Sequence, residues 1–591
     1  MTSTSDTLSS TRQLDSETAK PQFPQGLQTV LALLVLGAGV AEGWAFRNFV
    51  TLDGISYLDV ADAYFSGNFK DAINGHWSPM YSWLLGGFLR VLHTTPRTEF
   101  LAIHLFNFVV FGVALVSFGH FLSSFLTYLH QNAEDSKTQS LSPSTLIVLS
   151  YIAFAWVGIA LMGVRNTTPD LLVLTATLWA TDLVVLIRLK GASWPRFTAL
   201  GAVLAFGYLS KAIMFPLGFV FILASIFAAR NFRQGVKLAM VAATVFVILS
   251  SPFILALSKK VGHLTFGESG RLNYGWYVNN MNPAFVHWHG QLPPEMGTPL
   301  HATRQVLPDI PVFEFATPIY GTYPVWYDPA YWYAGMRTHF SLREQLRAIV
   351  FNSRKLVDVL FDLDGVWIFS LTVLICTAGV INYLGEIWSN AFLLLPPGVA
   401  LALYLDVLVV ERYIAPFVLV ILIVMLGCVR LPANGYLSKR IATAVLVATL
   451  FATAFFGVKF LFWSKGVLAE NEAVPDEMWK VAAGASELGI RPGDKIAELM
   501  PAMGREDQLP AKTQNPVWAR LLGVRITAEL AAPHSNVFWS SDEMTRQRIL
   551  QALASTGAKA VIDYDIPPAV HPEGWTRIDD TRFFFKRLND E

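Results

Sequence analysis

The chain has 591 residues, of which 53% are hydrophobic and only 15% are charged, against about 25% charged in a typical soluble protein. Lys and Arg balance Asp and Glu at 44 each, and a zero net charge argues against nucleic acid as a partner, since a nucleic-acid binder would show a basic excess. The low polarity excludes a disordered or coiled-coil protein. Cys376 and Cys428 lie in apolar runs and offer neither a disulfide framework nor a cysteine zinc site. The composition therefore predicts a large multi-pass membrane protein.

The charges are unevenly spread, and this predicts how the chain is divided. Residues 1–26 are rich in Ser and Thr and are interpreted as a disordered cytoplasmic tail. Residues 464–591 are about 27% charged, whereas the 463 residues before them are about 12% charged. We therefore expect a transmembrane domain at 27–463 and a soluble extracytoplasmic domain at 464–591.

Eleven apolar runs approach the length of about 20 residues that a helix needs to cross a bilayer core of about 30 Å. They lie at 27–46, 99–129, 144–164, 170–188, 197–213, 215–229, 238–257, 365–384, 389–409, 413–429 and 441–463. The predicted fold is an all-α polytopic membrane bundle of about eleven transmembrane helices, in which the division around Lys211 stays open.

Basic residues concentrate in the segments on one side of these runs. They are Arg12, Lys20, Lys137, Arg188, Lys190, Arg196, Arg230, Arg233, Lys237, Arg430, Lys439 and Arg440. Because loops rich in Lys and Arg stay in the cytoplasm, we expect a cytoplasmic N-terminus. Segments 47–98 and 258–360 and the C-terminal domain would then face the periplasm.

The first external segment carries the most informative residues. Apolar positions recur at helical spacing over 56–65, which predicts a helix on the membrane surface, and a second helix is expected at 79–92. Asp59 and Asp62 would project near each other from the first helix. Asp53 is either a general base or electrostatic partner for a lipid-borne substrate, or the N-cap of this helix.

Five short motifs follow one another along residues 27–430. They are Asp53-Gly-Ile-Ser-Tyr57, Ser78-Pro-Met-Tyr-Ser-Trp83, Thr168-Pro-Asp170, Tyr208-Leu-Ser-Lys211 followed by Pro216, and Glu411-Arg-Tyr-Ile-Ala-Pro416. This arrangement resembles the GT-C superfamily of polytopic glycosyltransferases, and within it the protein O-mannosyltransferases and the lipid A aminoarabinose transferases. The chain departs from many relatives at Gly54, where they carry a second acidic residue, and at His76-Trp77, where they carry a Lys.

The resemblance implies transfer of a sugar from a polyprenyl-phosphate carrier to a cell-envelope acceptor, whether lipid, glycan or protein, at the outer face of the bacterial inner membrane. Asp53 would deprotonate or orient the attacking group, with inversion at the sugar's anomeric carbon. The departing phosphate needs cationic stabilisation, for which Lys211 is the first candidate, followed by Arg412 and Arg165. Each has another reading: Lys211 could snorkel to the interface, Arg412 could pair with Glu411, and Arg165 could cap the third span.

Further residues are candidates for contact with the sugar or the acceptor. They are Tyr57, Asp59, His76, Trp77, Tyr81, Asn273, Trp326 and Asp328. His76 is a second acid or base or a structural residue, and Asp170 is expected to be a first-turn acid of its helix. Segment 258–360 is read as an ordered lid rich in aromatic residues. Its His287, His289 and His301 lack a diagnostic ligand spacing, so no cofactor is assigned and a divalent cation stays open.

The C-terminal domain is predicted to be α/β, with helices at 476–488 and 542–555 and strands at 560–563 and 582–586. Two other functions stay in view for the whole chain. One is a transporter or flippase of lipid-linked or polar solutes, and the other is a catalytically inactive assembly factor that keeps the fold. A transporter should show mid-membrane charges and internal repeats, whereas the body shows one mid-span acid, Asp182, and no repeat.

Overall fold

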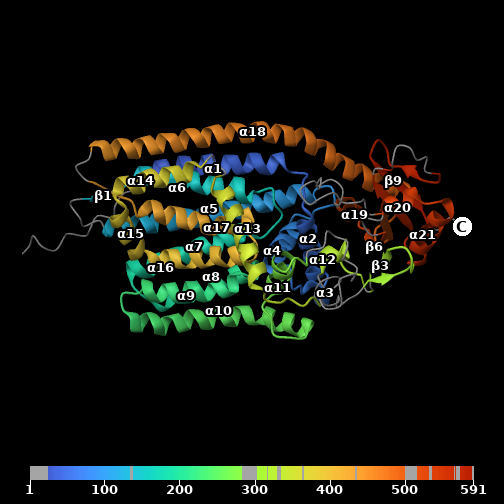
Figure 1. Cartoon of the computed structure of the whole chain (residues 1–591), viewed down its shortest axis with the longest axis horizontal. Coiled ribbons are helices and arrows are strands. Elements are labelled where there is room, and N and C mark those ends of the chain that lie inside the picture. The colour runs from blue at the N-terminus through green and yellow to red at the C-terminus, as the bar shows by residue number, and fades with distance from the viewer. Residues whose placement is uncertain are drawn as a thin grey trace, which may run out of the picture.

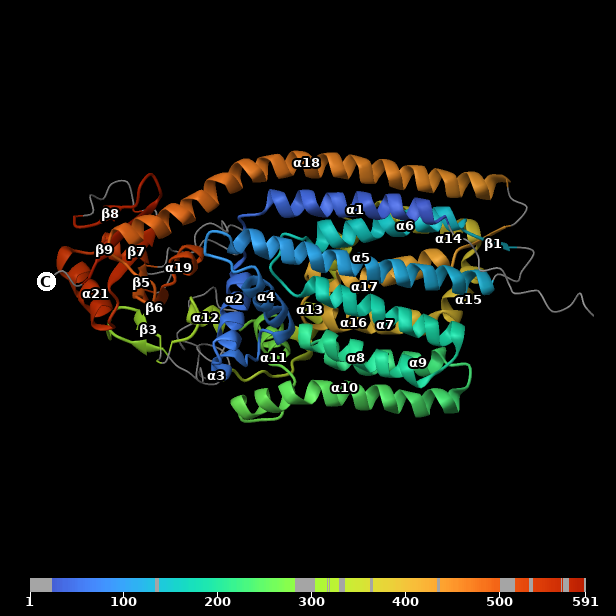
Figure 2. The ribbon, with the colours of Figure 1, turned by 180° about the vertical axis from the view of Figure 1, so that it is seen from behind.

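The computed structural model of the protein describes residues 24–132, 138–281, 303–315, 317, 319–328, 335–361, 365–432, 436–499, 516–530, 535–564, 566 and 573–588. The molecule is elongated, with a bundle of long helices over most of its length and a sheet at the end that carries the C-terminus (Figure 1). Short helices formed by residues 52–91 lie between the bundle and the sheet, as Figure 2 shows from behind.

A helix occupies each of the eleven segments in which the sequence predicts a span. The bundle consists of α1 (Gln25–Ala45), α5 (Glu99–Gln131), α6 (Pro143–Ala155) with its π-helical continuation η1 (Trp156–Met162), α7 (Asp170–Lys190), α8 (Trp194–Ser210), α9 (Met214–Ala228), α10 (Phe232–Val261), α14 (Val366–Ala378), α15 (Val380–Ser389), α16 (Ala391–Val407), α17 (Glu411–Gly427) and α18 (Tyr436–Glu487). Helices α7 and α17 are buried along most of their length, as expected of helices that are apolar on every side. Helix α10, at the edge of the bundle, exposes Met240, Ile248 and Leu255, which suits a lipid-facing position.

Fewer helices are long and apolar enough to count as membrane spans than the eleven that the sequence predicts. Within the described residues, five pass: α1, α5, α6 with η1, α7 and α10. A sixth passes if α14 and α15, which meet at 105°, count as one broken span, while α9 and α16 are apolar but shorter. The protein is therefore mostly helical with five or six candidate spans, and the number eleven stays a prediction.

The basic loops of the bundle lie at the end away from the seven-stranded sheet (Figure 2). Arg230 Nη2 donates to the Leu189 carbonyl at 3.3 Å, and Arg196 Nη1 donates to the Gly191 carbonyl at 2.7 Å. Strands β1 (Thr138–Ser140) and β4 (Arg430–Pro432) pair antiparallel at the same end. The charge asymmetry is thus built into the two ends of the molecule, while the side of the membrane that each end faces stays a prediction.

The outer helices cover the end of the bundle nearest the sheet. They are α2 (Leu52–Phe65), α3 (Phe69–Ala72), α4 (Pro79–Val91), α11 (Ser269–Asn273) with the π-helical η2 (Tyr274–Val278), α12 (Pro324–Tyr327) and α13 (Leu342–Leu360). The helices predicted at 56–65 and 79–92 are confirmed as α2 and α4. Residues 54–61 of α2 are buried within the protein, and its predicted place on the membrane surface stays a prediction. The burial arises because α2 packs against α4 on one side and, on another, against α19 (Val517–Leu522), which lies next to the sheet.

The sheet is assembled from two distant parts of the chain. Its order is β2 (Arg304–Gln305), β3 (Val312–Glu314), β6 (Arg525–Leu530), β5 (Lys495–Leu499), β7 (Ala560–Tyr564), β9 (Phe583–Arg587) and β8 (Thr576–Arg577). Strand β5 is parallel to β6 and β7, and the other pairs are antiparallel. Two helices, α20 (Ser535–Ser540) and α21 (Glu543–Ser555), accompany the strands. Strands β2 and β3 belong to the segment 258–360, in which the sequence indicated no strand.

The predicted local elements of the C-terminal region are present. The segment 476–488 forms the end of α18, 542–555 forms α21 with Asp542 as its N-cap, and the two predicted strands lie in β7 and β9. The predicted boundary between 463 and 464 falls inside α18, which is continuous from Tyr436 to Glu487. The division into domains stays a prediction.

Candidate active site

A cavity of about 490 Å³ lies where α2 meets the ends of α7, α8, α16 and α17. Eight of the twelve residues that the sequence singles out line it: Asp53, Tyr57, His76, Trp77, Lys211, Asn273, Trp326 and Arg412. These residues come from motifs up to 359 positions apart. The motifs therefore converge on one place in the fold.

Four charged side chains form an alternating chain across this cavity. Arg412 Nη2 donates to Asp53 Oδ2 at 2.7 Å, and Arg412 Nε lies 3.7 Å from Asp170 Oδ2. Asp170 Oδ1 in turn accepts from Lys211 Nζ at 2.6 Å, and Thr168 Oγ1 donates to Asp170 Oδ2 at 2.8 Å. Two carboxylates and two cations thus neutralise one another in a site that is largely withdrawn from water.

The position of Asp53 shows that it does not cap α2. Thr51 is the N-cap and accepts a hydrogen bond from the Gly54 N–H at 3.1 Å. Asp53 lies in the first turn of the helix, where a negative charge is stabilised by the helix dipole, and its carboxylate faces the cavity. The capping alternative considered from the sequence is therefore wrong.

Lys211 lies in a break between two helices. Helix α8 ends at Ser210, Lys211 is extended (φ −156°, ψ 128°), and α9 begins at Met214. Its ammonium group lies 3.4 Å from the centroid of the Tyr413 ring and pairs with Asp170. An ion pair and a cation–π contact hold Lys211 in the cavity rather than at the lipid interface.

Gly54, where many relatives carry a second acidic residue, has no room for a side chain. A Cβ at this position would lie 2.6 Å from Thr167 Cβ and 2.9 Å from Val50 Cγ1. The loop before α7 therefore packs directly on the backbone of α2. Any side chain at position 54 would require Thr167 or Val50 to shift.

Aromatic side chains enclose the cavity above Asp53. Trp326 Nε1 donates to Asp53 Oδ1 at 3.3 Å, and the Trp77 indole donates to the carbonyls of Trp326 at 3.2 Å and Tyr327 at 3.1 Å. The Tyr57 and Trp77 rings meet edge to face with centroids 5.1 Å apart. Segment 319–328 therefore lies against Asp53, while an ordered lid over 258–360 stays a prediction.

His76 is buried in the wall of the cavity beside Trp77 and Trp276. Burial lowers the pKa of its imidazole to about 4, although the Asp53 and Asp328 carboxylates oppose the shift. The ring is therefore neutral at neutral pH and does not supply a proton as an acid. Its Nδ1 atom is buried and has no hydrogen-bond partner within the described residues.

The other four candidate residues lie outside this cavity. Arg165 pairs with the buried Glu42 of α1 at 2.5 Å, and the Tyr81 hydroxyl donates to Asn107 Oδ1 at 2.8 Å. Asp328 pairs with Lys260 at 3.3 Å, and Asp59 binds Arg520 at 2.9 Å on a different face of α2. The structure thus does not bring Arg165, Tyr81, Asp328 or Asp59 to the carboxylate of Asp53.

The described residues offer no site for the divalent cation left open by the sequence. No group of three or more His, Cys, Asp or Glu within them could hold a metal ion, and His287, His289 and His301 lie outside them. At Asp53 the carboxylate oxygens already accept from Arg412 and Trp326. We therefore derive no step that involves a metal.

Sequence reasoning undervalued two residues of the cavity. Asp170 does lie in the first turn of α7, as expected, but it also joins Lys211 to Arg412. The Tyr413 ring lies against Lys211 and Arg412, the two cations that pair with Asp170. Asp170 lies in the Thr168-Pro-Asp170 motif and Tyr413 in the Glu411–Pro416 motif, so the motifs indicate the site better than the helix preference of single residues does. Lys211 and Arg412, the partners of Asp170, are distant from it in sequence, so their pairing carried no local signal.

No protein-family model matches the chain, and no curated protein matches its sequence. Among solved structures, the oligosaccharyltransferase of Archaeoglobus fulgidus in the apo form is similar over 91% of this chain and 69% of that one, with a TM-score of 0.46 and 11% identity. ArnT from Cupriavidus metallidurans is similar in the apo state (95% and 97% covered, TM-score 0.40, 12% identity) and bound to undecaprenyl phosphate (96% and 98%, 0.39, 11%).

Both of these proteins are membrane glycosyltransferases of the GT-C superfamily, the superfamily that the sequence motifs resemble. At identities of 11–12% and TM-scores below 0.5, the similarity carries no argument about substrate, acceptor or catalytic residues. The function of the cavity has to be argued from its own side chains.

Proposed function

We propose that the protein transfers a sugar from a polyprenyl-phosphate carrier to a cell-envelope acceptor at the outer face of the membrane. The observation that best supports this function is the position of Arg412. It touches Asp53 and Asp170 at once, with Lys211 on the far side of Asp170, in a cavity between membrane helices and a covering segment.

The two cations suit the phosphate of the carrier. Lys211 has three N–H donors and Arg412 has five, and the paired carboxylates occupy only part of them. A phosphate that enters between them gains charge-assisted hydrogen bonds without stripping either carboxylate of its partner. As the bond between the anomeric carbon and the phosphate oxygen breaks, the bonding electrons pass to the phosphate, and these cations stabilise its growing negative charge.

Asp53 suits the acceptor side of the reaction. Arg412 holds its carboxylate at the cavity, where it can accept the proton of an acceptor hydroxyl or amine while that group attacks the anomeric carbon. The new bond forms on the face opposite the departing phosphate, so the reaction inverts the configuration. The neutral His76 ring, with its unpartnered Nδ1, suits a sugar hydroxyl and not an acid role.

The remaining lining of the cavity suits the isoprenoid chain. Apolar side chains line the part formed by α9, α16 and the loop before α11, namely Ile213, Pro216, Phe266, Leu403, Val407 and Leu408. A site that is charged at one end and apolar at the other matches a phosphate attached to a hydrocarbon.

The test uses the full-length protein in proteoliposomes, supplied with a panel of undecaprenyl-phosphate-linked sugars and extracted envelope lipids, glycans and proteins. We expect transfer by the wild-type protein, and a loss of about 10²- to 10⁴-fold in Asp53→Asn, because Asn cannot accept the proton. Asp53→Asn should keep its affinity for undecaprenyl phosphate, whereas Lys211→Ala should lose it.

Lys480→Ala is the matched control, since Lys480 forms an exposed ion pair with Asp580 beside the sheet. Equal transfer by Asp53→Asn and the wild type would exclude Asp53 as the base. Absence of transfer over the whole panel, with movement of the labelled carrier between leaflets, would favour a flippase. Carrier binding with neither activity would favour an inactive assembly factor.

A further inference from the structure

Residues 319–328, here called the strap, connect the sheet to the candidate active site. At the sheet end, the Ile526 N–H of β6 donates to the Thr322 carbonyl at 3.0 Å, and Arg525 Nη1 donates to the Ile319 carbonyl at 2.8 Å. The Tyr323 hydroxyl donates to Glu529 Oε2 of the same strand at 3.1 Å. The strap is thereby attached to β6 along its first half.

The second half of the strap is fixed around Asp53. Its Trp326 indole donates to Asp53, and the Trp326 carbonyl accepts from Ser56 Oγ at 3.2 Å. Asn74 Nδ2 donates to the Tyr327 carbonyl at 2.7 Å, and the buried Tyr327 hydroxyl donates to the Asp71 carbonyl at 2.8 Å. A displacement of the strap by the sheet would therefore change the contact between Trp326 and Asp53.

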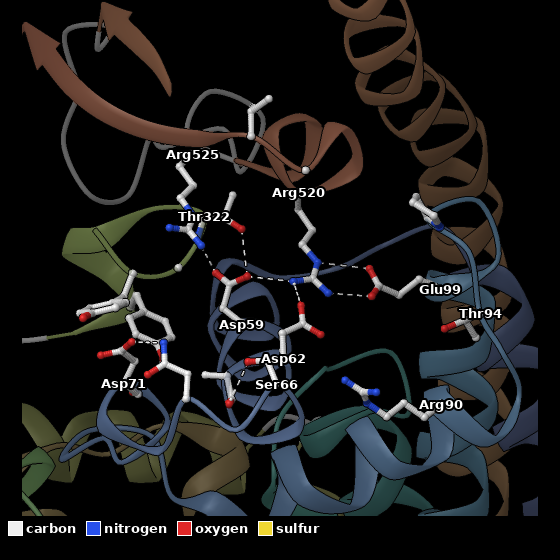
Figure 3. A pocket seen from close by; sticks show the side chains of 18 of the residues that line it. Asp59, Asp62, Ser66, Asp71, Arg90, Thr94, Glu99, Thr322, Arg520 and Arg525 are labelled. Atoms are coloured by element: carbon white, nitrogen blue, oxygen red, sulfur yellow. Dashed lines mark hydrogen bonds and ion pairs between the residues drawn. The ribbon is translucent and has the colours of Figure 1, made fainter. Parts of the chain in front are cut away.

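One arginine of the sheet region joins the strap to the outer helices. Arg520 of α19 lies opposite three carboxylates: Asp59 at 2.9 Å and Asp62 at 2.5 Å on α2, and Glu99 at 2.8 Å on α5 (Figure 3). Asp59 also accepts from the Thr322 N–H at 2.7 Å and from its hydroxyl at 2.9 Å. Asp59 is thus the point where Arg520, α2 and the strap meet.

The charges in this cluster make Arg520 indispensable to its geometry. The Arg520 side chain is only 13% exposed and that of Asp59 only 7%. Burial raises the pKa of Asp59, and the Arg520 guanidinium acts in the opposite direction. Without Arg520, Asp59, Asp62 and Glu99 would lose the guanidinium that they share, and Arg90 and Arg525 would be the other arginines lining the cavity at this cluster. The loss of the shared contact would free α2 and the strap to move apart.

Helix α2 carries both the cluster and the candidate base. Asp53 and Asp59 are six residues apart, or about 9 Å along the helix axis. They point to different faces, toward the cavity at Asp53 and toward a polar cavity of about 550 Å³ around Arg520. The two elements that Arg520 holds, α2 and the strap, are the ones that supply Asp53 and the indole that covers it.

We propose that Arg520 is a positioning residue, which holds α2 and the strap together through Asp59 and so fixes Asp53 and Trp326 for the reaction. This inference rests on the proposed function for its catalytic half. It assigns the sheet a part in catalysis although none of its side chains lines the cavity with Asp53 in the described structure.

The test combines hydrogen exchange of the full-length protein in nanodiscs with the transfer assay. The variants are Arg520→Lys, which keeps the charge but cannot contact three carboxylates at once, and Thr322→Val, which removes one donor to Asp59 and leaves the cluster paired. Arg548→Ala is the matched control, because Arg548 pairs with Asp309 on the exposed side of the sheet. We expect both variants to speed exchange at 319–328 and to lower kcat by about 10- to 100-fold with little change in KM for the donor.

Exchange at 319–328 that matches the Arg548→Ala control in both variants would overturn the proposal, since the strap would then be held without Arg520. A lower kcat with unchanged exchange would overturn it as well, because the effect would not pass through the strap. If the wild-type protein transfers no sugar at all, the proposed function fails on its own, and the exchange data still decide whether Arg520 orders the strap.

Discussion

Arg412 shows how one side chain can serve two carboxylates that the sequence keeps apart. The planar guanidinium presents Nη2 to Asp53 and Nε to Asp170 from two fixed positions, whereas the three donors of a lysine all lie on one nitrogen. Because each carboxylate keeps a cationic partner, the cavity can hold two negative charges side by side. An anion that arrives meets fixed donors and not a rearranging site.

The close packing of Gly54 against Thr167 and Val50 can be tested by adding a single methyl group. Gly54→Ala should lower the free energy of unfolding by about 1–3 kcal/mol, since the new methyl group cannot fit between Thr167 and Val50. The thermal midpoint in detergent measures this loss. Gly119→Ala in α5, where a Cβ meets nothing within 4 Å, is the control and should show no loss. A midpoint for Gly54→Ala equal to that of the control would contradict the close packing of α2.

Among the elements, the three central strands of the sheet place acidic residues side by side. Glu498 of β5 lies opposite Glu529 of β6, and Asp563 follows on β7. Burial, with Glu529 and Asp563 nearby, raises the pKa of Glu498 to about 8. The folded protein therefore holds a proton at neutral pH that the unfolded chain, with a carboxyl pKa near 4.5, releases.

This proton makes stability depend on pH in a definite direction. The contribution of Glu498 is fully present below about pH 4.5 and is lost as the pH rises toward about 8, because only the folded state holds the proton in that window. Glu498→Gln should remove this part of the slope, so that its thermal midpoint falls less than the wild type's between pH 6 and 9. Glu543→Gln, on the exposed side of α21, is the control. An unchanged slope in Glu498→Gln would contradict the raised pKa.

The elements also show what the sequence could and could not predict. Helices such as α2, α4 and α21 follow from local periodicity and capping residues, which a single segment contains. The five motifs likewise led to the cavity, because each carries its own residues there. Strand β2 has only two residues and pairs with β3. Strand β3 gave no local signal, since its partner β6 lies more than 200 positions further along the chain. For the same reason, the ion pair between Lys211 and Asp170, which joins the end of α8 to the start of α7, carried no local signal.

At the scale of the whole molecule, the sheet and the basic loops lie at opposite ends of the bundle (Figure 1). The predicted orientation can be tested with single cysteines in a variant that lacks Cys376 and Cys428. A membrane-impermeant maleimide, added to spheroplasts, should label Glu543→Cys beside the sheet and leave Arg233→Cys, in the first turn of α10, unlabelled until the membrane is opened. Labelling with the reverse pattern would place the cavity on the cytoplasmic side.

The sheet that draws strands from both sides of α13 has a practical consequence for the study of this protein. A fragment cut at the predicted boundary, residues 464–591, would lack β2 and β3 and leave the outer edge of β6 without its partner. A bare, mainly apolar edge is a template on which further copies can add, so such a fragment is prone to aggregate. The unit that folds is discontinuous in sequence, and isolating it calls for a fusion that supplies the 303–315 hairpin alongside the C-terminal strands.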